Sequence, residues 1–145
     1  MTAQQKHYNA MNLCIWLTAT MPNAGVFYLQ KEGFKTMKHG LNVEIAKKYG
    51  VNAAIVLHEI NVLTHSWQIQ FNARETYHFG RYWARLSTED FKKLFPYMSV
   101  YAIKKAIHDL YDYGLIEIDN FNKNRLDQTL WYTISLKGSK LINGR

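Results

Sequence analysis

The chain of 145 residues is poor in cysteine and in acidic side chains, and it has no long apolar run. Its single cysteine, Cys14, cannot form a disulfide within the chain, so we expect a reducing compartment, the cytoplasm. The apolar run Leu13–Leu17 is far shorter than a membrane span, and no small-residue cleavage site follows it. The sequence therefore predicts a cytoplasmic protein that does not contact a membrane.

Motifs of catalysis and cofactor binding are also missing. His58-Glu59 begins like the zinc-protease motif H-E-x-x-H, but Val62 stands where the second histidine is needed. The one cysteine and six histidines lack the spacing of a structural zinc site. Glycine-rich loops that bind ATP or a dinucleotide are absent. We therefore expect no enzymatic activity, no catalytic residues, no cofactor and no metal.

Acidic side chains are outnumbered, 11 against 18 lysines and arginines, which gives a net charge of +7. Residues 1–40 have a net charge of +3, residues 41–75 are neutral, and residues 76–145 have a net charge of +4. This excess fits an anionic partner, and the neutral middle fits a scaffold. Because 48% of the residues are hydrophobic, the chain can build the core of one domain.

The most informative segment, Ser87–Leu136, predicts helix, tight turn, helix, strand, polar loop and strand. Ser87 is a good N-cap with Asp90 three residues later, close to a capping box. Pro96 ends this first helix, and Ser99 can cap a second one only three residues on. A connection that short is typical of a helix-turn-helix.

The second helix of this segment has an apolar face and a basic face. Its cations lie in the N-terminal half and its acids come late, which suits a recognition helix that enters the major groove of DNA. An ordinary amphipathic helix with a solvated charged face has the same pattern. The predicted buried stripe is Ile103, Ala106, Ile107 and Leu110, and the predicted groove-facing residues are Ser99, Tyr101, Lys104, Lys105 and His108.

Two alternating strands follow, Leu115–Phe121 and Leu130–Leu136, joined by a polar loop. A hairpin with a basic tip beside a basic helix is the arrangement of a wing, whose cations contact phosphate. Arg81 and Arg85 are expected to add cationic surface nearby. The residues expected at phosphates or in the minor groove are Lys92, Lys93, Lys123, Asn124 and Arg125.

Several motifs of this segment occur together: the turn Phe95–Ser99 (FPYMS), a basic helix that ends in Gly114-Leu115-Ile116, the asparagine-rich loop Asn120–Asn124, and Asp127–Thr133 (DQTLWYT) before Leu136-Lys137-Gly138. The combination resembles the winged-helix domain of phage and plasmid replication initiators, the replisome organisers of Gram-positive bacteria. Residues 41–60 (LNVEIAKKYGVNAAIVLHEI) resemble the first helices of that family. The chain departs from the family at Phe79, which replaces the acid of a D-G-x-x-W segment.

The resemblance and the patterns together predict a mainly α-helical fold with a small antiparallel β-hairpin. This is a winged helix-turn-helix over residues 37–145, preceded by an N-terminal extension over residues 1–36. The resemblance implies sequence-specific binding of double-stranded DNA at a replication origin, with helicase-loading or other host replication proteins as further partners. Two hypotheses stay open: a phage-encoded inhibitor or adaptor that binds protein on the same scaffold, and a transcriptional repressor.

The remaining elements are predicted from local patterns. Asn42 is expected to cap a short helix that ends at Gly50, followed by one long helix from about Asn52 to Gln70. Two apolar stripes on the long helix imply two packing partners, such as the winged core on one side and the N-terminal extension or a second subunit on the other, so a homodimer is a hypothesis. Residues 71–76 are expected to form a loop, residues 77–86 a strand with a turn at Gly80, and residues 137–142 a final short turn.

Overall fold

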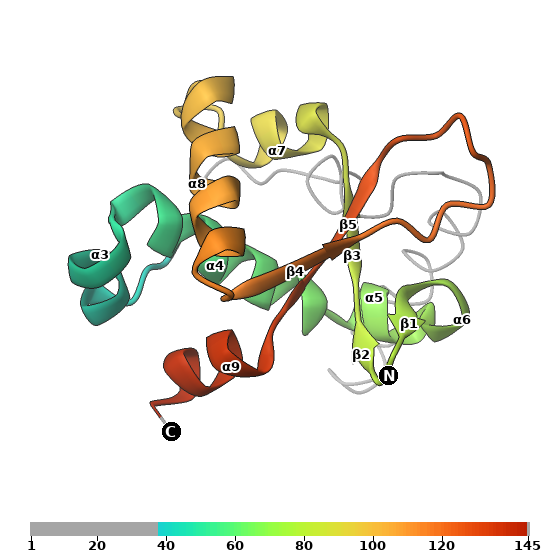
Figure 1. Ribbon diagram of the computed structural model, residues 1–145, viewed down its shortest axis with the longest axis horizontal. Helices are drawn as coiled ribbons and strands as arrows, with labels where there is room; N and C mark the ends of the chain where they lie inside the picture. Colours follow the sequence, from blue (N-terminus) through green and yellow to red (C-terminus); the bar gives the residue numbers. More distant parts are fainter. Residues whose placement is uncertain (1–37, 145) are drawn as a thin grey trace, which may run out of the picture.

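The computed structural model describes residues 38–144, so the predicted extension, residues 1–36, lies outside the described part (Figure 1). Helices make up more than half of the described residues, and a three-stranded antiparallel sheet has the order β3-β5-β4. The fold is therefore mixed α/β, and the predicted hairpin is extended by a third strand. The elements are α3 (Val43–Tyr49), α4 (Val51–Thr64), α5 (Trp67–Phe71), α6 (Ala73–Thr76), β1 (Tyr77–His78), β2 (Arg81–Tyr82), β3 (Ala84–Leu86), α7 (Thr88–Leu94), α8 (Val100–Asp112), β4 (Ile116–Asp119), β5 (Leu130–Ile134) and α9 (Leu136–Asn143).

Side-chain caps set the ends of α7 and α8, as predicted. The Ser87 hydroxyl accepts the Asp90 N–H, and the Asp90 carboxylate accepts the Ser87 N–H, which completes a capping box. The Ser99 hydroxyl accepts the Ala102 N–H at the start of α8. At the other end Gly114 takes a φ of 70°, the left-handed conformation of a C′ glycine.

The predicted long helix from Asn52 to Gln70 is wrong, because α4 ends at Thr64 and α5 begins at Trp67. The hydroxyls of Thr64 and Ser66 donate to the carbonyl oxygens of Ile60 and Leu63, at 3.0 and 2.6 Å. These side chains satisfy the carbonyls at the end of α4 locally, so the helix ends without continuing into the next turn.

Two other local predictions are wrong. Residues 73–76 form the short helix α6 instead of part of a loop. The segment after β5 is α9, a helix of 8 residues instead of a short turn, and the Ser135 hydroxyl caps it by accepting the Gly138 N–H. Leu141 and Ile142 on α9 pack against the core, as expected.

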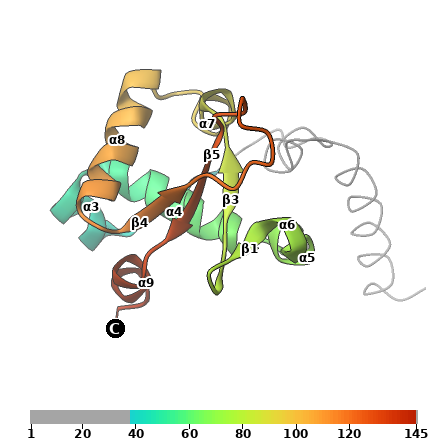
Figure 2. The same cartoon turned by 45° about the vertical axis from the view of Figure 1, so that its right-hand side comes forward.

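The core forms where α4 packs against α3, α8 and β5 (Figures 1 and 2). Leu57 and Ile60 of α4, Leu110 of α8, and Phe95 after α7 are almost fully buried there. These partners within the chain cover most of both apolar stripes predicted for this helix. Ile55 packs against the core, whereas Val62 is the exception and is exposed. Ile103, Ala106 and Leu110 form the buried stripe of α8 as predicted, with Ile107 half-buried.

The sheet has two chemically different faces. Ile116, Ile118 and Tyr132 alternate with Glu117, Asp119 and Trp131 along the paired strands β4 and β5, so the two sets point to opposite sides. The first set faces the helical core. The second shares its face with Arg85 of β3, which lies opposite Trp131. This outer face carries polar side chains next to the β1–β2 hairpin.

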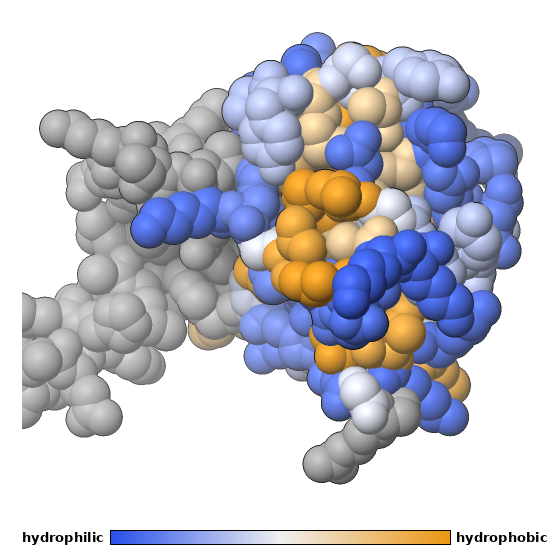
Figure 3. Space-filling model, turned by 90° about the vertical axis from the view of Figure 1, so that its left-hand side faces the viewer, coloured by the Kyte–Doolittle hydropathy of each residue, from blue (hydrophilic) through white to orange (hydrophobic). Residues whose placement is uncertain are grey.

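The side of the molecule that carries α3 shows an apolar area among hydrophilic residues (Figure 3). Large apolar side chains exposed in and beside α3 are Leu41, Val43 and Val51. Across residues 38–144, every helix is too short or too polar to cross a membrane.

Candidate nucleic-acid interface

The turn between α7 and α8 is held by hydrogen bonds of its own side chains. Lys92, predicted at phosphate, lies at the end of α7 and donates from Nζ to the carbonyl oxygens of Met98 and Pro96, at 2.5 and 3.3 Å. The Ser99 hydroxyl, predicted to face the groove, accepts a backbone N–H as the cap of α8. Both residues therefore help to fix how α8 leaves the turn, and the exposed Lys93 points from the same helix end.

A cluster of polar side chains ties this turn to α4. His39 Nδ1 lies 2.7 Å from the Tyr97 hydroxyl, and its Nε2 lies 3.9 Å from the Glu59 carboxylate. Burial lowers the pKa of His39, and the charge of His58 lowers it further. Burial also raises the pKa of Glu59. No group of three or more His, Cys, Asp or Glu side chains within residues 38–144 is placed to hold a metal ion.

The exposed face of α8 carries the predicted groove-facing residues. Tyr101 is 76% exposed, and Lys104, Lys105 and His108 are exposed as well. Lys105 Nζ lies 2.7 Å from the Asp109 carboxylate, whose hydrogen bond and charge raise the pKa of Lys105. His108 Nδ1 lies 3.0 Å from the carboxylate of Asp112.

Lys104 differs from its two cationic neighbours on α8. It has no hydrogen-bond or ion-pair partner among the residues that the structure describes. Beside it, a groove of about 290 Å³ runs between α8 and the sheet. Ile107 and Tyr111 of α8 and Ile118 and Leu130 of the sheet line this groove. Lys104 is therefore an unneutralised cation at the rim of an apolar groove.

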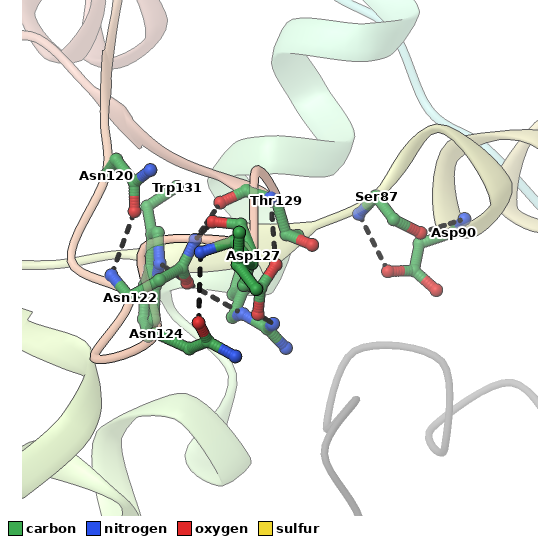
Figure 4. Close-up of polar contacts among 10 residues, drawn as sticks. Ser87, Asp90, Asn120, Asn122, Asn124, Asp127, Thr129 and Trp131 are labelled. Carbon is green, nitrogen blue, oxygen red and sulfur yellow. Dashed lines mark hydrogen bonds and ion pairs between the residues drawn. The ribbon is translucent and has the colours of Figure 1, made fainter.

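The loop between β4 and β5 is built around one amide side chain, Asn122 (Figure 4). Its Nδ2 donates to the carbonyl oxygens of Asp127 and Thr129, at 2.9 and 2.6 Å. Its Oδ1 accepts from Trp131 Nε1 at 2.9 Å and from Arg85 Nε at 3.1 Å. The four bonds join both ends of the loop to the outer face of the sheet.

An ion pair completes the base of the loop. The Arg85 guanidinium contacts the Asp127 carboxylate, which also accepts the Thr129 N–H at 3.0 Å. The hydrogen bonds from Thr129 and the charge of Arg85 lower the pKa of Asp127. Arg81 likewise pairs with Glu117 at 2.6 Å. The expectation that both arginines add cationic surface is therefore wrong, because each is neutralised by an acid on a neighbouring strand or loop.

The tip of the loop carries the remaining predicted residues. The Asn124 side chain accepts the Leu126 N–H at 3.0 Å, so it shapes the turn. Lys123 and Arg125 are exposed and have no hydrogen-bond or ion-pair partner within the described chain. Positive charge is thus left unneutralised at the tip, while Arg85 and Asp127 pair at the base and Asp119 at the end of β4 has no basic partner among the described residues.

The exposed face of α8 and the tip of the β4–β5 loop lie along one edge of the molecule. Figures 1 and 2 show the N-terminal half of α8, then α7, then the β4–β5 loop along the top of the view. Sequence reasoning brought these predicted residues together but missed Arg85, Asn122 and Asp127 as the residues that hold the loop. The alternation of β3 was the available signal, since it puts Arg85 on the same face as Trp131.

Protein-family models, curated proteins and solved structures were all compared with this chain, and none of them matches it. The function proposed below therefore rests on the geometry and charge of the chain itself and on the motifs of its sequence.

Proposed function

We propose that residues 38–144 form a winged helix-turn-helix domain that binds double-stranded DNA. In this proposal α7 and α8 are the helix-turn-helix, the strands β3, β5 and β4 are its sheet, and the β4–β5 loop is the wing. The α8 helix enters the major groove with its N-terminal half, and the wing contacts the backbone beside it.

The observation that carries this proposal is the distribution of unpaired charge along one edge. Lys104, Lys123 and Arg125 lack acidic partners within the described chain, whereas the nearby Glu117 and Asp127 are bound by arginines. An edge with positive charge at both ends matches the phosphates on either side of a groove.

The residues divide into two roles under this proposal. Tyr101, Lys104 and His108 face base edges, because they lie on the exposed face of α8. Lys93, Lys123 and Arg125 contact phosphate, because long cations at a helix end or a loop tip reach the backbone first. Lys105 contributes less charge, since Asp109 already neutralises it.

The proposed target is the replication origin of a phage or plasmid, on the strength of the sequence motifs described above. A helicase-loading protein is then the expected further partner. A transcriptional repressor would use the same DNA site and differ only in the sequence it selects. Selection of preferred duplexes from a random pool distinguishes the two, because the selected sequence lies either in an origin or in a promoter.

Fluorescence anisotropy with a labelled random duplex, across a salt series, tests the DNA proposal. We expect binding whose affinity falls steeply as salt rises, because cations of the protein release counterions from phosphate. A double variant that removes Lys123 and Arg125 should lower both affinity and salt dependence. Absence of duplex binding at low salt would contradict the proposal.

A second candidate function is binding of another protein. The apolar groove beside α8 and the apolar area beside α3 favour it, because exposed apolar surface is typical of protein contacts. Leu130→Asp places a charge on the groove wall. If the groove binds a protein, this variant loses the partner. If the edge binds only DNA, it retains nearly all DNA affinity.

A further inference from the structure

The tip of the β1–β2 hairpin holds a residue that the turn does not favour. Tyr77 pairs with Tyr82 and His78 with Arg81, which leaves a two-residue turn of Phe79 and Gly80. Their φ angles are 51° and 77°, both positive, as in a type I′ turn. Asparagine, aspartate and glycine suit that conformation, whereas a bulky side chain is strained in it. Phe79 is the only such non-glycine residue within 38–144.

Burial does not explain Phe79 either. The residue is 79% exposed, one of the most exposed large apolar residues of the described chain. An asparagine or aspartate at this tip would adopt the positive φ with less strain and would not expose a large apolar side chain to solvent. The phenyl ring itself is therefore the feature that needs an explanation.

The ring stands on a fixed aromatic base. Its centroid lies 5.9 Å from that of Phe121, which stacks on His78 at 4.0 Å with an angle of 14° between the planes. Trp83 meets Phe121 edge-on at 4.9 Å and donates from Nε1 to the His78 carbonyl oxygen. Because Trp83 is buried, this base holds the Phe79 ring at a defined place on the surface.

The charges of the β4–β5 loop favour one chemical class of ligand for this ring. Phe121 opens the β4–β5 loop, whose tip carries the unpaired cations Lys123 and Arg125. Of the three acids on this side, Glu117 and Asp127 are bound by Arg81 and Arg85. The third, Asp119, is exposed without a basic partner in the described part of the chain, so the two cations still outnumber the unpaired acid. An exposed ring beside the first residue of a loop that carries two unneutralised cations suits a ligand that is both aromatic and anionic. A nucleotide has both properties.

We propose that Phe79, supported by Phe121 and His78, is a stacking site for an unpaired nucleobase beside the duplex that α8 and the loop bind. The inference rests on the proposed function and extends its substrate to a junction between duplex and single strand. The base must be unpaired, because bases within a duplex stack on one another and present only their edges in the grooves.

The test compares three labelled probes in anisotropy titrations. One is a blunt duplex. The second is the same duplex with a thymidine overhang of about eight nucleotides, within the usual span of single-strand sites. The third has an overhang of abasic residues, which keeps the phosphates and lacks the bases.

The proteins are the full chain, Phe79→Asn and Phe79→Tyr. Asparagine suits the turn and removes the ring, so the fold should be kept, and a thermal melt checks this.

We expect the full chain to bind the thymidine overhang at least about fivefold more tightly than the abasic one. Phe79→Asn should abolish that preference, and Phe79→Tyr should retain it. Equal affinity for the two overhangs overturns the inference, and so does a preference that survives in Phe79→Asn. In either case, binding of the blunt duplex leaves the proposed function intact. Failure to bind any duplex overturns the proposed function, and the junction with it.

Discussion

The α8 face and the β4–β5 loop both present cations, but they arrange their acids differently. On α8, Lys105 and His108 pair with acids one turn further along the same helix, at 2.7 and 3.0 Å. In the loop, the acid Asp127 is bound by Arg85 at the base, which leaves Lys123 and Arg125 at the tip without acidic partners. The loop therefore offers more unneutralised charge, and α8 offers more varied hydrogen-bonding groups. We expect the loop to supply general affinity for DNA and α8 to supply discrimination.

The largest expected effect comes from removing the side chain that builds the loop. Asn122→Ala deletes four hydrogen bonds, removes the acceptor of the Trp131 indole N–H and removes one of the acceptors of the Arg85 guanidinium, which keeps Asp127. We expect the free energy of unfolding to fall by about 2–3 kcal/mol in chemical denaturation. Asn124→Ala is the matched control, since its side chain makes one bond at the exposed tip and should cost much less. Equal losses in both variants would show that Asn122 does not organise the loop.

The second-largest expected effect concerns Lys104 on α8 and the discrimination between DNA sequences. Lys104→Ala should reduce discrimination between preferred and random duplexes by about 1–2 kcal/mol if its ammonium contacts a base edge. Competition titrations with the two duplexes measure it. Lys105→Ala is the control, because Asp109 holds that ammonium in the unbound protein. A larger loss of discrimination in Lys105→Ala would reverse the assignment within the helix.

A smaller effect is expected at the loop tip, with a different signature. Arg125→Ala should weaken binding to all duplexes alike and lower the slope of log affinity against log salt by about one. The reason is that a phosphate contact releases a counterion without reading sequence. A change confined to the preferred duplex would mean that the loop also reads bases.

The smallest effect distinguishes the stability of the α7–α8 turn, which His39 contacts, from that of the β4–β5 loop by its pH dependence. The pKa of His39 is lowered from 6.5, so the unfolded chain takes up a proton before the folded one. The stability that neutral His39 contributes is therefore lost as pH falls through about 6.5. Glu59 acts in the opposite direction, because its raised pKa adds stability as pH falls towards 4.5. The lowered pKa of Asp127 makes the loop lose stability only below 3.8.

Denaturation of the full chain and of His39→Phe across this range measures the difference. The phenylalanine keeps a ring against Phe95, which lies 5.0 Å from the His39 ring, and removes the titration. We expect the loss near pH 6.5 to disappear in the variant. An unchanged pH profile would show that His39 does not control the stability of this part of the chain.

Predictions that depend on neighbouring residues along the chain are confirmed where the hydrogen bonds are local. Ser87, Ser99 and Asn42 cap their helices within three residues, and Gly114 ends α8 at a positive φ. The same reasoning missed the break between α4 and α5, because an apolar period continues through it. There the hydroxyls of Thr64 and Ser66 compete for the helix carbonyls, and periodicity does not register that competition.

The candidate interface could be predicted from sequence only as a set of exposed positions. Tyr101, Lys104 and Arg125 are exposed as expected, since each stands opposite an apolar stripe or in a polar loop. Their local charge was not predictable, because it depends on which acids lie close in space. Arg81 and Arg85 show this, since both belong to ion pairs with partners more than thirty residues away.

By itself the sequence determined the capped ends of α3, α7 and α8, the order of helix, turn, helix and strands, and the overall positive charge, because these follow from contacts over a few residues or from composition. Only the tertiary structure decided that β3 joins the sheet beside β5, that Arg85 meets Asn122 and Asp127, and that Phe79 stands on Phe121. The physical reason is the distance along the chain. Strand register and ring packing join residues that are separated by tens of positions, and no local pattern encodes which of them meet.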